Sequence, residues 1–301
     1  MTLFKNGAEG QTNGTAVTTG NSGASGDAFG VLSGTVTYDN AHAAHGSLGF
    51  KLSPASGSNA SVVFGSGVSG LTGTSYSSRF YIYLTAFPPG STEIWRSNAA
   101  SASLLSRVSI NASGQFVTAY NNGATTTLWT SVSTIPVNTW VRVETYTVLG
   151  SGGQFQAAFY NGDSTTAIDS GGGTGLTINA GPLQTVSFGK YGTDAHANAF
   201  WLDELAVNNS ATGFMGPFTE QLATPVVTLG AATNPSTIGG TNGSQVVSWS
   251  AIPNAVAYDA YLAIGSSPTQ GNFNLVASNV TSPYTFNGLG AGTYSYGIRA
   301  R

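Results

Sequence analysis

The sequence predicts an all-β fold, and three observations lead to this prediction. Short alternating or apolar runs recur along the 301-residue chain, with turn-forming residues between them. Nowhere do apolar residues keep the i, i+3, i+4, i+7 spacing of an amphipathic helix. With 41% hydrophobic residues, 11% aromatic residues and a net charge of only −3, the composition is that of a folded protein. We therefore expect a two-sheet sandwich.

Six segments of the first two thirds of the chain are expected to be strands. Each is followed, directly or within a few residues, by Gly, Pro, Asn or Asp, which favour turns. The segments are 79–84, 104–110, 115–120, 140–149, 154–160 and 185–188. Residues 111–114 and 150–153 contain the glycines that join two pairs of them as hairpins.

Residues 199–207 are expected to form the strand that closes this domain. Because side chains alternate along a strand, the adjacent Asp203 and Glu204 should point to opposite faces and cannot act as one pair. Asp203 is expected to share its face with Trp201, Leu205 and Val207. An aspartate on an apolar face needs backbone donors, a cation or a ligand, because an unpaired buried charge is strongly unfavourable.

A change of pattern after Phe218 predicts a domain boundary. We expect a first domain over residues 1–218, a linker over 219–224 and a smaller β domain over 225–301. The smaller domain has Trp249 in its second strand, tyrosines in the next strand at 257–262, and the ending Leu-Gly-Ala-Gly-Thr-Tyr at 289–294. In these residues it resembles a fibronectin type III domain, with Tyr294 at the tyrosine corner. The resemblance implies an immunoglobulin-like sandwich that serves as a spacer or a dock.

The first domain resembles the concanavalin A-like and laminin G-like jelly rolls. The residues that carry the resemblance are, in order, 45–52, the strand that begins at Arg79, 138–144 and 202–207. The resemblance implies two packed sheets, often a structural calcium ion, and often a sugar-binding face or rim.

Calcium ligands are hard oxygen donors, so the candidates are acidic residues. We expect Glu9, Asp27 and Asp203, with loop carbonyls near Gly10, to supply them if the N-terminal strand pairs beside the closing strand. In the alternative interpretation Asp203 accepts hydrogen bonds from the backbone amides of a neighbouring loop, and both remain open. His42 and His45 have a zinc-like spacing but are expected to be structural or solvated.

Neutral sugars bind aromatic rings that lie beside amides and a few charges. The residues that meet this description are Trp95, Arg96, Tyr120, Trp129, Lys190 and Tyr191. For each of them the alternative is a partly buried side chain of the sandwich. Trp140, Trp201 and Trp249 lie in regular alternation and are expected in the core.

Glycosidase chemistry needs two carboxylates on one face, as in the Glu-x-Asp-x-x-Glu strand of sugar-cleaving jelly rolls. None of the five glutamates here has an acidic residue two positions away. We therefore expect no enzyme and assign no catalytic residue, although acids that are distant in the sequence can still meet in the fold.

Partners are also constrained by composition. The nine Lys and Arg residues form no basic stripe for nucleic acid, and no apolar run approaches the length that spans a bilayer. Residues 3–23, together with Gly26-Asp27-Ala28-Phe29, resemble the start of minor tail proteins of phages that infect actinobacteria. This resemblance implies a virion protein assembled in the host cytoplasm that acts outside cells, contacts host surface glycan and other virion proteins, and forms homo-oligomers.

The expected function is therefore that of a non-enzymatic virion protein with a lectin-like domain that contacts host envelope carbohydrate. A purely structural virion protein, such as a capsid decoration or tail scaffold protein, is the first alternative. A polysaccharide-degrading enzyme is the second.

Overall fold

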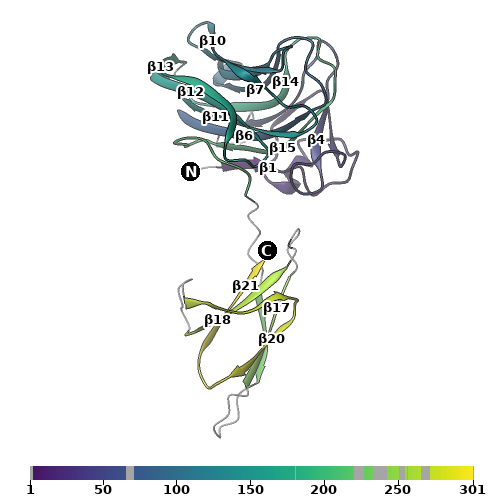
Figure 1. Cartoon of the computed structure of the whole chain (residues 1–301), viewed down its shortest axis with the longest axis vertical. Helices are drawn as coiled ribbons and strands as arrows, with labels where there is room; N and C mark the ends of the chain where they lie inside the picture. Colours follow the sequence, from purple (N-terminus) through teal and green to yellow (C-terminus); the bar gives the residue numbers. More distant parts are fainter. Residues whose placement is uncertain are drawn as a thin grey trace. The chain divides into compact units, whose positions relative to one another are not determined.

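The computed structural model describes residues 3–65, 71–179, 181–219, 227–233, 243–250, 255, 257–265 and 272–300. The chain divides into a first unit, Met1–Phe218, and a second unit, Thr219–Arg301 (Figure 1). The described elements are strands β1 to β21 and two short 3₁₀ turns, η1 (Ser22–Ser25) and η2 (Ala100–Ala102). The prediction of an all-β fold is confirmed. No helix in the described ranges is long and apolar enough to cross a membrane.

Sheet A of the first unit has the order β13-β12-β11-β6-β15-β4-β3, and β1 also pairs with β15. All its pairings are antiparallel. Its strands are β1 Leu3–Asn6, β3 Thr35–Asp39, β4 Gly49–Ser53, β6 Ser75–Leu84, β11 Trp140–Val148, β12 Gly150–Asn161, β13 Ala167–Ile178 and β15 Phe200–Asn208.

Sheet B packs against sheet A and has the order β10-β9-β8-β7-β14-β5-β2. Its strands are β2 Val31–Ser33, β5 Ala60–Gly65, β7 Thr92–Asn98, β8 Leu104–Ile110, β9 Gln115–Asn121, β10 Thr125–Thr134 and β14 Thr185–Tyr191. The chain passes repeatedly from one sheet to the other, from β4 to β5, β6 to β7, β10 to β11 and β13 to β14 to β15. This alternation between two antiparallel sheets is that of a jelly roll.

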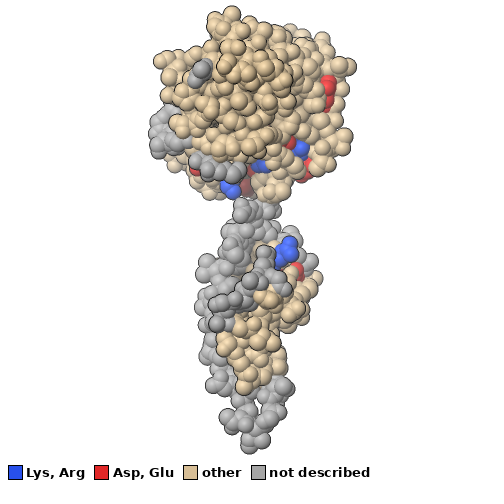
Figure 2. All heavy atoms as spheres, turned by 90° about the vertical axis from the view of Figure 1, so that its left-hand side faces the viewer, with Lys and Arg blue, Asp and Glu red and all other residues tan. Residues whose placement is uncertain are grey.

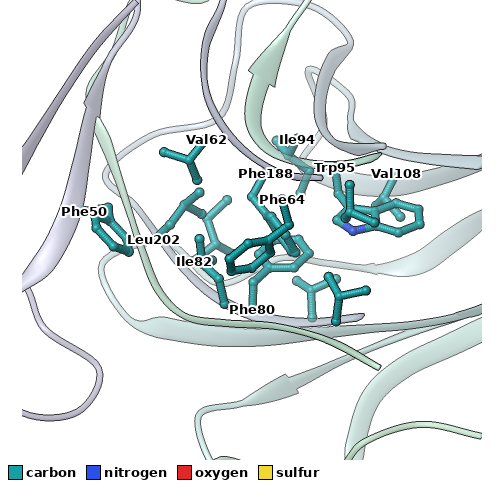
Figure 3. Close-up of a cluster of buried hydrophobic side chains, with 14 of the residues drawn as sticks. Phe50, Val62, Phe64, Phe80, Ile82, Ile94, Trp95, Val108, Phe188 and Leu202 are labelled. Carbon is teal, nitrogen blue, oxygen red and sulfur yellow. The ribbon is translucent and has the colours of Figure 1, made fainter. Parts of the chain in front are cut away.

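The core lies between the two sheets, where alternate side chains of each strand meet (Figure 3). Phe80 from sheet A contacts Phe188 from sheet B with ring centroids 5.5 Å apart, and Phe64 lies 6.0 Å from Phe188. All three rings are at most 1% exposed. Aromatic pairs in such tilted geometry contribute roughly 0.5–1.5 kcal/mol beyond their buried area.

The closing strand β15 does not alternate as expected, because it contains a β-bulge. Asp203 pairs with Tyr81, but Ala206 pairs with Arg79, so β15 has one residue more than β6 over this stretch. Glu204 has a φ of 49°, which is uncommon for a residue with a side chain. The prediction of a shared face is therefore wrong: Leu205 and Val207 lie in the core, whereas Trp201 and Asp203 lie outside it.

The second unit has two three-stranded sheets, with the orders β16-β17-β20 and β19-β18-β21. The strands are β16 Val227–Thr233, β17 Gly243–Trp249, β18 Tyr258–Ile264, β19 Asn274–Val280, β20 Tyr284–Leu289 and β21 Tyr294–Ala300. Trp249 lies in the core of this unit with Val247 and Phe286, as predicted. The Tyr294 hydroxyl donates to the Gly290 carbonyl at 3.2 Å, the type of bond that a tyrosine corner makes.

A run of glycines in β13 allows the edges of the two sheets to meet. Trp129 and Leu128 of β10 pack over β13, and a Cβ atom on Gly171 would lie 2.3 Å from Trp129 Nε1. A Cβ on Gly173 would lie 3.0 Å from Leu128. Residues 171–173 therefore lie within a strand and leave space for Trp129.

The substitution Gly171→Ala tests this packing. The added methyl group must displace the indole of Trp129, and overpacking of this kind costs about 1–3 kcal/mol. Chemical denaturation should show that loss of stability, with a change in the tryptophan emission. Gly213→Ala, where a Cβ meets nothing within 4 Å, should leave stability within about 0.5 kcal/mol of the wild type.

Candidate functional site

The candidate site is the outer face of sheet A, the face that points away from the core. Because successive side chains of a strand point to opposite faces, the residues that precede and follow each core residue in the sequence lie on this outer face. It has three parts: a buried ionic cluster around Arg142 and Glu144, a row of aromatic rings, and a groove beside β12 and β13.

The ionic cluster is built on an ion pair between Arg142 and Glu144, two positions apart on β11. Arg142 Nε lies 2.8 Å from Glu144 Oε1, and both side chains are 1% exposed. Arg142 also donates from Nη1 to the Gly162 carbonyl at 2.8 Å and from Nη2 to the Ser164 carbonyl at 2.9 Å. Its guanidinium carbon lies 4.1 Å from the ring centre of Tyr160. All three nitrogens of this guanidinium are thus engaged within the protein.

Residues 211–218, here called the exit strap, cover the ion pair. The Gly216 amide donates to Glu144 Oε2 at 2.8 Å, and the Phe218 amide donates to the Tyr81 hydroxyl at 2.8 Å. Arg79 donates from Nη1 to the Pro217 carbonyl at 3.2 Å, and its guanidinium lies over the ring of Phe218. Hydrogen bonds between side chains of sheet A and the backbone of the exit strap therefore hold it on this face, as they would hold a bound peptide.

Tyr81, Asp163 and His45 form a hydrogen-bonded chain at the border of the ionic cluster. The Tyr81 hydroxyl donates to Asp163 Oδ1, and His45 Nε2 lies 3.0 Å from Asp163 Oδ2. Burial, together with the bond to Asp163, raises the pKa of Tyr81 to about 12, so the phenol is protonated at neutral pH. Burial alone would raise the pKa of Asp163, but the bonds from Tyr81 and His45 outweigh it and hold that pKa below its ordinary value.

The aromatic row crosses three neighbouring strands. Trp140 of β11, Tyr83 of β6 and Trp201 of β15 lie directly opposite one another. The ring of His42 stacks on Tyr83 at 4.0 Å, and Trp201 Nε1 donates to Asp39 Oδ1 at 3.0 Å. Trp140 and Trp201, which we had expected in the core, are therefore on the outer face. His42 and His45 contact different partners, in keeping with structural roles.

The groove has a volume of about 360 Å³ and lies along β12 and β13. Its lining consists of Gln156, Ala157, Ser170, Gly171, Gly172, Gly173, Thr174 and Phe214. The lining thus combines an amide, two hydroxyl groups, strand backbone and the ring of Phe214, which is 38% exposed. None of these side chains is charged.

The acids that we had predicted as calcium ligands bind backbone amides instead. Asp203 Oδ2 accepts from the amides of Ala44 at 2.8 Å and His45 at 3.2 Å. Glu9 Oε1 accepts from the amides of Ser47 at 2.7 Å and Leu48 at 2.8 Å, so both acids hold the loop before β4.

The third predicted ligand, Asp27, accepts from the amide of Lys5 at 2.9 Å. Within the described part of the chain, no three His, Asp or Glu residues are grouped so as to hold a metal ion. The three acids therefore do not meet at one site, and the alternative in which Asp203 accepts bonds from a neighbouring loop describes this geometry.

Asp203 is completely buried, and its environment perturbs its ionisation. Burial raises the pKa of Asp203 well above its ordinary value, and the nearby charge of Glu204 adds to this. The amides of His45, Ala44 and Glu204 oppose the shift because they stabilise the carboxylate.

The residues that we had predicted to bind sugar are divided between the interior and the surface. Trp95 and Lys190 are 0% exposed: Trp95 stacks on Phe155, and Lys190 Nζ donates to three backbone carbonyls. Their burial removes both from any surface site. Tyr120 is 9% exposed and belongs to the core, and Trp129 packs partly buried over β13.

Arg96 and Tyr191 are brought together, on the outer face of sheet B. The Arg96 guanidinium lies 4.0 Å from the centre of the Tyr191 ring. Glu93 and Arg107 join this contact, and neither was predicted.

Sequence reasoning also missed Gln156, Ser170, Thr174 and Phe214. For Phe214 the available signal was that an aromatic residue follows Gly213, just beyond the closing strand. No alternating pattern surrounds this residue, so the sequence does not indicate that its side chain is exposed.

Comparisons with known proteins give similarities at low identity. No family model matches the chain, and no curated protein matches it. Among solved structures, the "Cellulose induced protein, Cip1" is 15% identical, with a TM-score of 0.47, over 69% of this chain and 98% of that one. A mutant of alginate lyase Aly36B in complex with alginate trisaccharide is 11% identical, with a TM-score of 0.45, over 69% and 98%. The binding domain of Paraclostridial Mosquitocidal Protein 1 is 15% identical, with a TM-score of 0.45, over 81% and 63%.

The substitution Asp203→Ala tests the role of this buried carboxylate. It leaves the amides of Ala44 and His45 without their acceptor, and an unsatisfied buried donor costs about 1–3 kcal/mol. We expect the unfolding free energy to fall by about that amount in urea titrations. Asp27→Ala, which removes one bond at a more exposed position, should lower it by less than about 1 kcal/mol. Equal losses in the two variants would contradict this interpretation.

The bond from Tyr81 to Asp163 predicts a pH-dependent effect. Because the pKa of Asp163 is lowered in the folded state, its contribution to stability is present above its ordinary pKa and is lost as the pH falls through the folded-state value. The stability lost in Tyr81→Phe should therefore be larger at about pH 5 than at about pH 2. Tyr83→Phe, on the same face of β6, should show no such pH dependence in the same denaturation series.

Proposed function

We propose that the first unit is a non-enzymatic, lectin-like domain that binds a neutral glycan chain in the groove beside β12 and β13. The observation that carries this proposal is the lining of the groove. An aromatic ring, an amide and two hydroxyl groups meet there without a charged side chain. Aromatic rings cover the apolar faces of sugars, and polar neighbours hydrogen-bond their hydroxyl groups.

The backbone of β13 supports the same proposal. β13 is the last strand of sheet A in the described structure, and β12 is its hydrogen-bonded neighbour. The other edge of such a strand presents backbone amides and carbonyls that a ligand can reach. At 171–173 the strand itself carries no side chains, because all three residues are glycine, while Trp129 and Leu128 pack against one face of this stretch. Sugar hydroxyl groups, which both donate and accept, suit an edge of this kind.

The surface charge favours a neutral ligand. On the face of the first unit drawn in Figure 2, Lys, Arg, Asp and Glu cover small areas and other residues cover most of the surface. The whole chain has only 7% charged residues. Nucleic acid and anionic membranes, which need clustered positive charge, are correspondingly poor partners.

The acids of the outer face support binding rather than catalysis. Glu144 is 1% exposed and is engaged by Arg142 and by the exit strap. Asp203 is completely buried and accepts three amides. Neither carboxylate is free to act as a general acid or a nucleophile on a bound sugar.

We further propose that this domain belongs to a phage virion, as a minor tail-type protein that contacts host envelope glycan. The support is the resemblance of residues 3–23 and 26–29 to the start of minor tail proteins of actinobacterial phages. In this proposal the second unit is a fibronectin type III-like spacer or dock to other virion proteins, and the particle presents several copies.

The 301-residue chain should bind neutral polysaccharide from the host envelope in a calorimetric titration, without release of sugar. Phe214→Ala removes the ring of the groove, so we expect at least about tenfold weaker binding, which corresponds to about 1.4 kcal/mol. Val31→Ala is the matched control, because Val31 is an apolar residue with the same 38% exposure as Phe214, and it lies on β2, at the opposite edge of sheet B from β10, which packs over β13.

Other outcomes would change the assignment. Loss of binding in Trp140→Ala but not in Phe214→Ala would move the site to the aromatic row. Sugar release would establish an enzyme. No binding to any fraction, with unchanged host adsorption of particles that lack the protein, would establish a structural virion protein.

A further inference from the structure

Two arginines lie directly opposite each other on the outer face of sheet B. Arg96 of β7 and Arg107 of β8 are cross-strand partners. Like charges in this position repel each other and destabilise a sheet. The chain has only nine Lys and Arg residues in all, so an unfavourable pair of them calls for an explanation.

The hydrogen bonds of these arginines leave donors unused. Arg96 Nε donates to Asn98 Oδ1 at 3.1 Å and lies 3.4 Å from Glu93 Oε1, and Arg107 Nη1 lies 3.3 Å from Glu93 Oε2. In the described structure the remaining guanidinium nitrogens of both have no hydrogen bond, and none of them is among the buried unpaired atoms. They therefore reach solvent. Arg142, in contrast, uses all three of its nitrogens inside the protein.

The surroundings hold the two guanidinium groups in place and leave room beside them. The ring of Tyr191 supports Arg96 at 4.0 Å, and Glu93 lies between the two arginines as their shared counter-ion. The next residues across the sheet are small: Ala119 lies opposite Arg107, and Ser187 lies opposite Arg96. Two arginines with one carboxylate leave an excess of positive charge here, where the Arg107 side chain is 38% exposed and the Arg96 side chain is 13% exposed.

We propose that Arg96 and Arg107 form an oxyanion subsite that takes the carboxylate or sulfate group of an acidic sugar. Guanidinium groups bind such oxyanions through paired, charge-assisted hydrogen bonds, and pre-organised donors lose little freedom when they do so. An incoming oxyanion also relieves the repulsion between the two arginines. This subsite lies on sheet B, on the opposite side of the sandwich from the neutral groove on sheet A.

Glu93 makes the subsite sensitive to pH. Burial raises the pKa of Glu93, while Arg96 and Arg107 oppose the shift. The charged and titratable groups that face Glu93 are Arg96 on β7, Arg107 on β8 and Tyr191 on β14. Protonation of Glu93 removes the negative charge that competes with a bound anion, so affinity should rise as the pH falls.

The test is a calorimetric titration of the 301-residue chain at low salt with a glucuronate-containing oligosaccharide, a neutral oligosaccharide and sodium sulfate. We expect Arg107→Ala to weaken binding of the acidic oligosaccharide at least about tenfold, because charge-assisted bonds to arginine are lost. Glu93→Gln should bind it at least as tightly as the wild type and should lose the increase in affinity that the wild type shows as the pH falls towards the ordinary pKa of glutamate. Lys5→Ala removes an exposed cation elsewhere and is the matched control.

The outcomes separate this proposal from the proposed function. Phe214→Ala should affect only the neutral ligand, and Arg107→Ala only the acidic one. Unchanged acidic binding in a folded Arg107→Ala variant, or an equal loss in Lys5→Ala, would overturn the subsite. Equal affinity for sulfate and for the acidic oligosaccharide would keep the oxyanion site but overturn its assignment to a sugar.

Discussion

The ion pair between Arg142 and Glu144 determines how the outer face of sheet A is covered. A buried ion pair is tolerated only when hydrogen bonds satisfy its remaining donors and acceptors, because desolvation costs several kcal/mol per ion. Here the carbonyls of Gly162 and Ser164 and the amide of Gly216 do so. The ion pair therefore holds both the loop after β12 and the exit strap in place. The loop brings Asp163 to Tyr81, and the strap brings Phe214 to the groove.

Much of the fold follows from sequence patterns, because alternation and turn residues are local signals. The hairpin of β11 and β12 is an example: its strands alternate and glycines join them. The bulge at Glu204 has no such signal, because a single extra residue with positive φ can be any residue that tertiary contacts hold in place. Because of this extra residue, the side chains of Leu205 and Val207 point to the opposite face from Asp203 and lie in the core. The same residue explains why Asp203 lies outside the core.

Less of the surface chemistry was accessible from the sequence, because it depends on register between distant strands. Arg96 was singled out for its aromatic neighbours, but its cross-strand partner Arg107 becomes visible only when β7 and β8 are aligned. Trp95, the neighbour of Arg96, was also predicted to bind sugar. The local strand geometry instead buries its side chain completely. Phe214 follows the last strand of the unit, where no periodicity predicts which way a side chain points.

The attachment of the exit strap also has a mechanical consequence. Phe218 is the last residue of the first unit, so tension transmitted from the second unit reaches the bonds at Phe218, Pro217 and Gly216 before it reaches β15. These bonds follow one another along a single short segment and would break in succession. Release of residues 211–218 would lengthen the tether by up to roughly 25–30 Å while both sheets stay intact. Under tension the exit strap would thus detach and extend before the two sheets of the sandwich unfold.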